Sequence, residues 1–376
     1  MIKVLIVAGA MNMGGIENQL MHLARKADKS EFQIDFTTTE EHPFFMDEIQ
    51  NLGGECVRIK GTNGFRFIRY CKSLFKVIQS GNYDIVHSHE LFHSGLVLLT
   101  ARLAGIKVRI VHAHNWTDMN SLTAKRPIRR TVYNAFMRKL ILQNATEFCA
   151  CSSYAGRFLY GDKVTHQPNY HIVFNSVDTD KYLNNYSDGK SFFPNDGWVN
   201  ILHVGRMCEQ KDQFFIVEIA KEIREQNKKI RILCAGDDSN NYGKMVKSRI
   251  TEEHLEDYIV LLGIRNDIDQ LFRACSAFIL PSQFEGMPLV LIEAQASGIQ
   301  SVCADTFSHE VDFGLNTIKW LDKATNPEIW VNEIEKAIKK ERATKSDIAA
   351  AIEKNGYSSQ SFTDKMCDLY KKAISV

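Results

Sequence analysis

Short β-branched runs alternate with amphipathic stretches of helical length along the sequence, in two separate series. The first series has apolar runs at residues 2–7, 33–37, 56–59, 85–87, 108–112, 148–151 and 171–174, with helical spacing at 15–27, 67–79 and 129–142. The second has runs at 199–204, 230–235, 259–262, 277–280 and 300–304. Strand–helix alternation predicts a mostly parallel sheet, because parallel strands need crossover connections. We therefore expect two doubly wound, Rossmann-like α/β domains.

The boundary between the series is expected at residues 175–197, a stretch rich in Asn, Asp, Ser and Tyr that contains Pro194. At roughly 150 residues per domain, a chain of this length holds two or three domains. The sequence therefore predicts a first domain at 1–178 and a second at 196–357.

Composition narrows the class of protein. With 44% hydrophobic and 24% charged residues the chain is globular rather than disordered. No apolar run approaches the ~20 residues of a membrane span, and the start lacks a basic region, so we expect a buried first strand and a soluble or peripheral protein. The nine cysteines include no CxxC pair, which indicates reduced thiols in the cytoplasm.

Positive charge is concentrated in the first half of the chain. Residues 51–140 carry 15 Lys and Arg against four acids, although the net charge is only +1. The basic stretch Lys125–Arg130 precedes Val132, Tyr133, Phe136 and Leu140, an amphipathic pattern that suits an anionic membrane. A solvated face explains the pattern equally well. No nucleic-acid module accompanies the charge, so nucleic acid is not expected as a partner.

The most informative segment is 278–298, where an apolar strand ends at Leu280 and a loop carries Glu285 before a helix. Pro288 suits the first helical turn. The free N–H groups of a helix N-terminus form a site for a phosphate. At 1.5 Å per helical residue Glu293 lies ~12 Å from Glu285, too far to share a proton or a metal. On spacing alone, a loop acid and a solvated helical acid remain the simpler interpretation.

The neighbourhood of these two acids changes that interpretation. Residues 284–290, followed by Glu293 and Ala294, closely resemble the E-x7-E segment of family 4 GT-B glycosyltransferases, retaining enzymes of the bacterial polysaccharide-biosynthesis type. The resemblance implies that Glu285 holds the hydroxyls of the donor sugar and Glu293 those of the ribose. It also implies that the intervening turn contacts sugar and phosphate, through Gly286, Met287, Pro288, Leu289 and Val290.

A second segment, 203–212, follows the first strand of the second series. Two cations five positions apart in a glycine-containing turn, Arg206 and Lys211, can neutralise a diphosphate without a metal. This signal is weak alone. The segment resembles the G-R-x4-K element of the same family, which implies that Arg206 and Lys211 clamp the departing diphosphate beside Gly205.

The N-terminal turn at residues 9–17 is not G-x-G-x-x-G, which weakens a nicotinamide-binding interpretation. Asp35 partly restores that interpretation as a ribose-binding acid, although an ordinary strand residue explains it better. The pair Gly14 and Gly15 resembles the family's loop facing donor phosphates and acceptor.

Histidines gather at 87, 89 and 93 and at 112 and 114, near the ends of predicted strands. Structural or substrate-facing roles are favoured over zinc. His114 resembles the family's histidine near the reacting sugar. Asp178-Thr179-Asp180 mimics a metal-binding motif, but residues 174–178 resemble the family's interdomain loop. We expect no catalytic metal and no cofactor.

Together the resemblance implies retaining transfer from a nucleotide sugar, with UDP preferred, to a glycan or lipid-linked acceptor. Its catalytic residues are His114, Glu285, Arg206 and Lys211. The second domain would bind the donor, the first would face the acceptor, and residues 358–376 would cross back to the first. The expected location is cytoplasmic, peripheral at the inner membrane face. A nucleotide-sugar epimerase, a non-catalytic partner subunit and a nicotinamide oxidoreductase remain alternatives.

Overall fold

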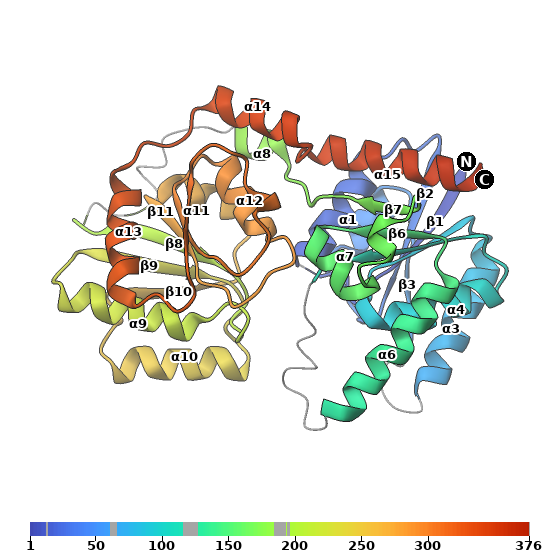
Figure 1. Cartoon of the computed structure of the whole chain (residues 1–376), viewed down its shortest axis with the longest axis horizontal. Helices are drawn as coiled ribbons and strands as arrows, with labels where there is room; N and C mark the ends of the chain where they lie inside the picture. The colour runs from blue at the N-terminus through green and yellow to red at the C-terminus, as the bar shows by residue number, and fades with distance from the viewer. Residues whose placement is uncertain (13, 61–65, 116–126, 184–192, 194–195, 376) are drawn as a thin grey trace. The chain divides into compact units, whose positions relative to one another are not determined.

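The computed structural model describes the chain except for residues 13, 61–65, 116–126, 184–192, 194–195 and 376. The described chain forms two compact units (Figure 1). Unit 1 comprises residues 1–176 together with 359–376, and unit 2 comprises residues 177–358. None of the described helices combines the length and the apolar content that a membrane crossing needs.

Unit 1 is built on a seven-stranded sheet in the order β3-β2-β1-β4-β5-β6-β7, and each pair of neighbours is parallel. The strands are β1 Ile2–Val7, β2 Phe32–Thr38, β3 Cys56–Arg58, β4 Ile85–Ser88, β5 Val108–Ala113, β6 Glu147–Ala150 and β7 Tyr170–Ile172. The expected parallel sheet is confirmed.

Helices cover both faces of this sheet. They are α1 Gly15–Lys26, α2 Met46–Asn51, α3 Arg66–Gly81, η1 Leu91–His93, α4 Ser94–Leu103, α6 Pro127–Asn144, α7 Ser153–Tyr160, η2 Val164–His166 and α15 Ser359–Ile374. Because side chains alternate along a strand, Val4 and Ile6 join the apolar core with α1 and α15, whereas Leu5 and Val7 join the core with α3 and α4. Residues distant in sequence thus build one core, with α15 packed against α1 (Figure 1).

Unit 2 repeats the architecture with a six-stranded parallel sheet in the order β10-β9-β8-β11-β12-β13. Its strands are β8 Val199–Val204, β9 Ile230–Ala235, β10 Ile259–Gly263, β11 Ala277–Leu280, β12 Ser301–Ala304 and β13 Ile318–Leu321. Its helices are α8 Thr179–Leu183, α9 Gln213–Glu225, α10 Asn241–Glu252, α11 Ile268–Ala274, α12 Leu289–Ala296, η4 His309–Val311, α13 Pro327–Lys339 and α14 Lys345–Asn355.

Two features of unit 2 differ from the sequence-based expectation. The stretch taken as a linker contains α8, which packs on α12 and α14, so the unit begins at Val177 rather than at 196. The edge strand β13 was not expected, because Ile318–Leu321 is short and mostly half-exposed.

Each sheet has one point where the strand order reverses. It lies between β1 and β4 in unit 1 and between β8 and β11 in unit 2. Crossovers leave such a sheet in opposite directions on either side of this point, which opens a crevice at the carboxyl ends of the two strands. These two strand pairs are where each unit is expected to bind a ligand.

Candidate active site

At the reversal point of unit 2, the loops after β8 and β11 bring together two residues that the sequence placed in separate motifs. The Nζ atom of Lys211 lies 2.6 Å from Oε1 of Glu285. Their side chains are only 15% and 7% exposed, so this is a nearly buried ion pair. Charges this sheltered interact strongly and are costly to separate.

The two loops are also joined by an amide that sequence reasoning missed. The side-chain Nε2 of Gln210 donates to Oε2 of Glu285 and to the carbonyl of Phe284, each at 3.1 Å. The carbonyl of Gln210 accepts from the backbone N–H of Gln283 at 2.7 Å. Both carboxylate oxygens of Glu285 are therefore held, which fixes the side chain for ligand binding.

Asp212, next to Lys211, has a structural role. It caps helix α9 by accepting from the N–H of Phe215, and its φ of 54° is left-handed. Its carboxylate pairs with Nζ of Lys323 at 2.6 Å. A lysine thus pairs with each of these two acids, Glu285 and Asp212.

A residue larger than glycine at position 205 would displace neighbouring atoms. A Cβ atom there would meet the aliphatic stem of Lys211 at 3.0 Å. The neighbouring Gly236 has a φ of 154°, and a Cβ there would lie 2.0 Å from the carbonyl oxygen of Gly205. The two glycines let the turns after β8 and β9 approach closely and seat Lys211 against the backbone.

Arg206 is exposed, unlike Lys211. Hydrogen bonds from Ser239 lower the pKa of Asp237, and the positive charge of Arg206 adds to this effect. The structure thus places Arg206 at the same strand end as Lys211 but with its guanidinium accessible to a ligand.

Helix α12 begins at Leu289, with Pro288 in the preceding, non-helical capping position. Gly286, Met287 and Val290 are buried around this first turn. No side chain caps the helix, so the N–H groups of its first turn are the groups that a phosphate or hydroxyl oxygen can use. The predicted turn thus lies at the start of a helix. The helix begins one residue later than expected, because Pro288 precedes the first helical turn instead of lying in it.

Glu293 occupies the last part of α12 and contacts a residue that sequence reasoning missed. Burial raises the pKa of Glu293 to about 7, while Lys181 and a hydrogen bond from Tyr182 oppose the shift. Tyr182 lies in α8, within the segment expected to be a linker. Glu293 is therefore half-buried and held by a phenol rather than solvated.

In unit 1, Gly14 and Gly15 begin helix α1, with Gly14 in its capping position and extended. A Cβ atom on Gly14 would lie 2.2 Å from a carboxylate oxygen of Glu17. An acid of the first helical turn thus folds back over this N-terminus, where the dipole stabilises it.

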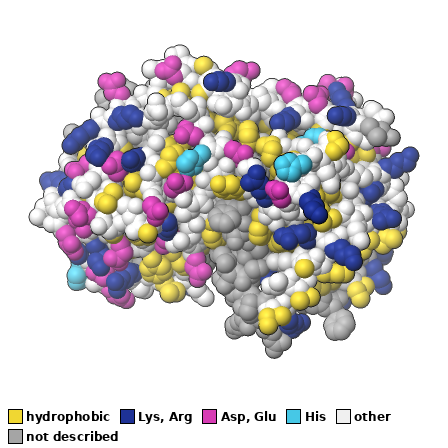
Figure 2. Space-filling view, in the orientation of Figure 1, with side chains coloured by type: hydrophobic (Ala, Val, Ile, Leu, Met, Phe, Trp, Pro, Cys, Tyr) yellow, Lys and Arg dark blue, Asp and Glu magenta, His cyan; other side chains and the backbone are white. Residues whose placement is uncertain are grey.

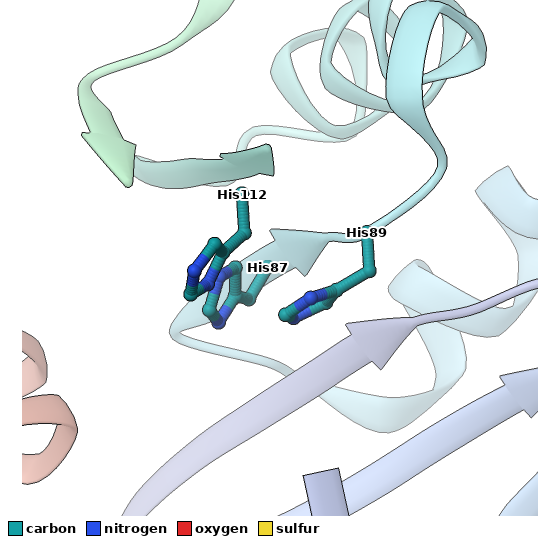
Figure 3. Close-up of side chains that lie close together, drawn as sticks. All are labelled: His87, His89 and His112. Atoms are coloured by element: carbon teal, nitrogen blue, oxygen red, sulfur yellow. The ribbon is translucent and has the colours of Figure 1, made fainter. Parts of the chain in front are cut away.

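Four histidines at the carboxyl ends of β4 and β5 form one buried cluster, and Figure 3 shows three of them, His87, His89 and His112. Nδ1 of His89 lies 2.7 Å from Nε2 of His114, and Nδ1 of His87 lies 2.8 Å from the hydroxyl of Tyr370. Burial lowers the pKa of His114 to about 4 and holds the pKa values of His87, His89 and His112 well below their usual range. The four rings are therefore neutral at physiological pH.

Three of these rings are close enough to raise the question of a metal. Ligand atoms of His87, His89 and His112 lie within 4.8 Å of one another. The rings of His87 and His112 are stacked, 5.5 Å apart and 11° from parallel. Imidazole lone pairs lie in the ring plane, so nearly parallel rings do not direct them at one point. This geometry favours a stack of neutral rings over a shared ion.

Two other predicted features have simple structural outcomes. Asp35 is buried and accepts hydrogen bonds from the hydroxyl of Tyr83 at 3.0 Å and the N–H of Glu55 at 2.9 Å, so it has a core role. Lys125 and Arg126 of the basic stretch lie outside the described residues.

Two doubly wound parallel units in one chain are the architecture of the GT-B fold, which this class of glycosyltransferases adopts. The fold is that of a protein from Anabaena, HepE, solved in complex with UDP-glucose, with a TM-score of 0.81, 16% identity and coverage of 99% of this chain and 100% of that one. It is also that of a sucrose-phosphate synthase from Thermosynechococcus elongatus, with a TM-score of 0.81, 14% identity and full coverage of both chains.

The chain belongs to glycosyltransferase family 4 and is a glycosyltransferase. Residues 13–181 match the family described as "Glycosyltransferase Family 4", and residues 189–358 match "Glycosyl transferases group 1". It is 31% identical to "Putative glycosyltransferase EpsF" of Bacillus subtilis over 98% of this chain and 96% of that protein. It is 28% identical to "Capsular polysaccharide biosynthesis glycosyltransferase CapH" of Staphylococcus aureus over 78% and 79% of the two chains.

Proposed function

We propose that this glycosyltransferase moves a hexosyl residue, with retention of anomeric configuration, from a UDP-sugar to a glycan or lipid-linked acceptor in polysaccharide biosynthesis. The observation that carries the proposal is the Lys211–Glu285 pair at the reversal point of unit 2, beside the start of α12. A carboxylate held for hydroxyl binding and two cations for a diphosphate are the groups that a nucleotide sugar needs.

Donor binding follows from the chemistry of each group. Glu285 accepts from hydroxyls of the donor sugar, and Glu293 accepts from those of the ribose. Arg206 and Lys211 stabilise the negative charge that develops on the departing diphosphate, and the N–H groups at the start of α12 add to this stabilisation. Lys211 is already mostly buried, so its field is weakly screened.

The same contacts support a metal-independent reaction. Two acids of these loops, Glu285 and Asp212, each pair with a lysine at 2.6 Å, so neither offers a free carboxylate to a divalent ion. The cations therefore take the place of a divalent ion at the diphosphate. His114, bonded to His89, has a role near the reacting sugar.

The donor and acceptor classes rest on relatives. The chain is 28% identical, over 62% of its length, to a protein of Escherichia coli named "UDP-Gal:alpha-D-GlcNAc-diphosphoundecaprenol alpha-1,3-galactosyltransferase". That name joins a UDP-sugar with a lipid-linked acceptor, and CapH is named for capsular polysaccharide. These names support a UDP donor and a cell-surface glycan as product.

The test uses a panel of UDP-, GDP- and ADP-sugars. A true donor at 100 times its Kd adds about 2.7 kcal/mol to stability, which a melting experiment detects. E285Q abolishes donor stabilisation and transfer, whereas E256Q, at an exposed position of unit 2, keeps both. NMR of the product shows retained configuration. If no nucleotide sugar shifts the melting temperature, the proposal fails; if GDP- or ADP-sugars alone do, the UDP assignment fails.

An anionic membrane surface is the location we propose. On α6, Ile128, Val132 and Phe136 are 80%, 64% and 54% exposed and recur every fourth residue, so they share one helical face. The same helix carries Arg129, Arg130, Arg138 and Lys139 and no acid. Figure 2 shows Lys and Arg side chains gathered over unit 1. Exposed apolar residues beside cations suit a lipid interface.

A location at the cytoplasmic face of the inner membrane is consistent with the state of the cysteines, because all nine are free thiols. Vesicles with 30% phosphatidylglycerol should co-sediment the protein, and neutral vesicles should not. The triple substitution of Ile128, Val132 and Phe136 by Ser should remove binding without loss of donor binding. Equal sedimentation with both vesicle types would refute the location.

A further inference from the structure

A cavity of about 550 Å³ lies at the reversal point of unit 1. It is bounded by the ends of β1 and β4 and by the first turns of α1, α3 and α6. This is the crevice where a doubly wound sheet binds its ligand. No residue of its β4, α3 and α6 walls has been assigned to the donor.

Glu90, two residues after β4, supplies a carboxylate to the lining of the cavity. Its Oε2 accepts from the hydroxyl of Tyr70 at 3.0 Å and lies 3.6 Å from Nε2 of His93. Its Oε1 faces Gly9, where an added Cβ would meet only this oxygen, at 3.9 Å. Burial raises the pKa of Glu90 to about 7. One carboxylate oxygen is thus bonded to Tyr70, and the other lies beside Gly9 in the lining of the cavity.

His89 supplies a second polar group. The residue is 8% exposed, and its Nδ1 is bonded to His114. Its Nε2 has no hydrogen-bond partner among the described residues, and His89 lines the cavity. A buried polar atom without a partner is unfavourable, and a hydroxyl of a bound ligand would satisfy it.

Part of the cavity lining is aromatic. The rings of Phe67 and Tyr133 stack 6.3 Å apart at 23°, and the His93 ring lies 5.5 Å from Phe67. The guanidinium of Arg130 lies 5.0 Å from the centre of the Tyr133 ring. Flat, partly exposed rings present a surface against which the apolar C–H face of a pyranose can pack.

We propose that this cavity binds a neutral pyranosyl residue of the acceptor, with Glu90 and His89 bonded to its hydroxyls and Phe67 and Tyr133 packed against its C–H face. The inference rests on the proposed function and adds to it a specificity for the acceptor sugar. Two carboxylates, Glu17 and Glu90, and one guanidinium, Arg130, line the cavity. A uronic acid is therefore disfavoured relative to a neutral hexose.

The experiment measures binding of sugars without a lipid. Methyl glycosides of glucose, galactose and N-acetylglucosamine, in both anomers, and methyl glucuronide are titrated into the full chain by saturation-transfer NMR, and UDP is titrated separately. E90Q and Y133A should each weaken the best neutral glycoside at least tenfold and leave the Kd for UDP within twofold. The matched controls E40Q and Y154A, at exposed positions of unit 1, should change neither.

Unchanged UDP binding shows that a variant is folded, and Y133A tests the aromatic wall without touching the buried carboxyl. The inference is overturned if no neutral glycoside binds, if both variants bind it as wild type does, if they weaken UDP equally, or if the glucuronide binds as tightly. Failure of the proposed function has another signature, since wild-type protein would then bind no nucleotide sugar whatever the glycoside result.

Discussion

Breaking the Lys211–Glu285 pair should destabilise unit 2 more than removing the pair altogether. In K211M the carboxylate of Glu285, 7% exposed, loses its cation and keeps the amide of Gln210. In E285Q the ammonium of Lys211, 15% exposed, loses its anion. An uncompensated buried charge costs about 3 to 5 kcal/mol, and the residual exposure and the Gln210 bond place both variants near ~3 kcal/mol.

The double variant K211M/E285Q contains no orphaned charge and should lose only about 1 kcal/mol. The interaction energy from the cycle is then about 5 kcal/mol, since two losses of ~3 kcal/mol collapse to one of ~1. Urea denaturation at pH 7, with equal slopes for all four proteins, measures each stability. Transfer should stay absent in all three variants, because the contacts to sugar and diphosphate are gone.

The more exposed pair Lys228–Glu335 provides the control. Its side chains are 21% and 33% exposed, and its N–O distance is 2.5 Å. The same cycle there should give an interaction energy of about 0.5 kcal/mol. Additivity within ~0.5 kcal/mol at Lys211–Glu285 would refute the argument that the pair is effectively buried. Recovery of transfer in the double variant would show that neither side chain contacts the donor.

Three further predictions concern single positions. Burial raises the pKa of Glu293 to about 7, so ionisation of this carboxyl opposes folding. As the pH rises from 5 to 8, wild type should therefore lose stability relative to E293Q. A stability difference in urea denaturation that does not change with pH would contradict this. G236A should lower the melting temperature strongly, since its Cβ would lie 2.0 Å from the carbonyl oxygen of Gly205, and a shift under ~2 °C would count against that geometry. Y370F removes the 2.8 Å bond to His87 and should cost about 1 kcal/mol, measured by denaturation; an equal or greater stability than wild type would show that the bond contributes nothing.

The sheets could be predicted from sequence because their signal is local. Runs such as Ile2–Val7 and Ile230–Ala235 are apolar, β-branched and bounded by turn residues, and their strands have these bounds in the structure. Strand β13 lacked that signal, and α8 was hidden in a polar stretch whose helix is stabilised by packing on α12 and α14.

The site was only partly predictable, for a related reason. Motifs placed Lys211 and Glu285 at the ends of two strands and assigned them to different parts of the donor, because spacing carries no information on contacts between side chains 74 positions apart. Their pairing depends on β8 and β11 being neighbours, which is a property of the sheet order. Tyr182 and Gln210 carry no motif, and nothing in the sequence marked them.

The return of α15 to unit 1 has a consequence for the order in which the protein forms. Phe362, Met366 and Tyr370 complete the core beneath α1, yet they are translated after all of unit 2. Unit 2 is continuous in sequence and can fold as it emerges from the ribosome. The core of unit 1 that α1 and α15 share stays partly exposed to solvent until the last helix has been synthesised. Loss of residues 359–376 would therefore harm the half of the protein that was synthesised first.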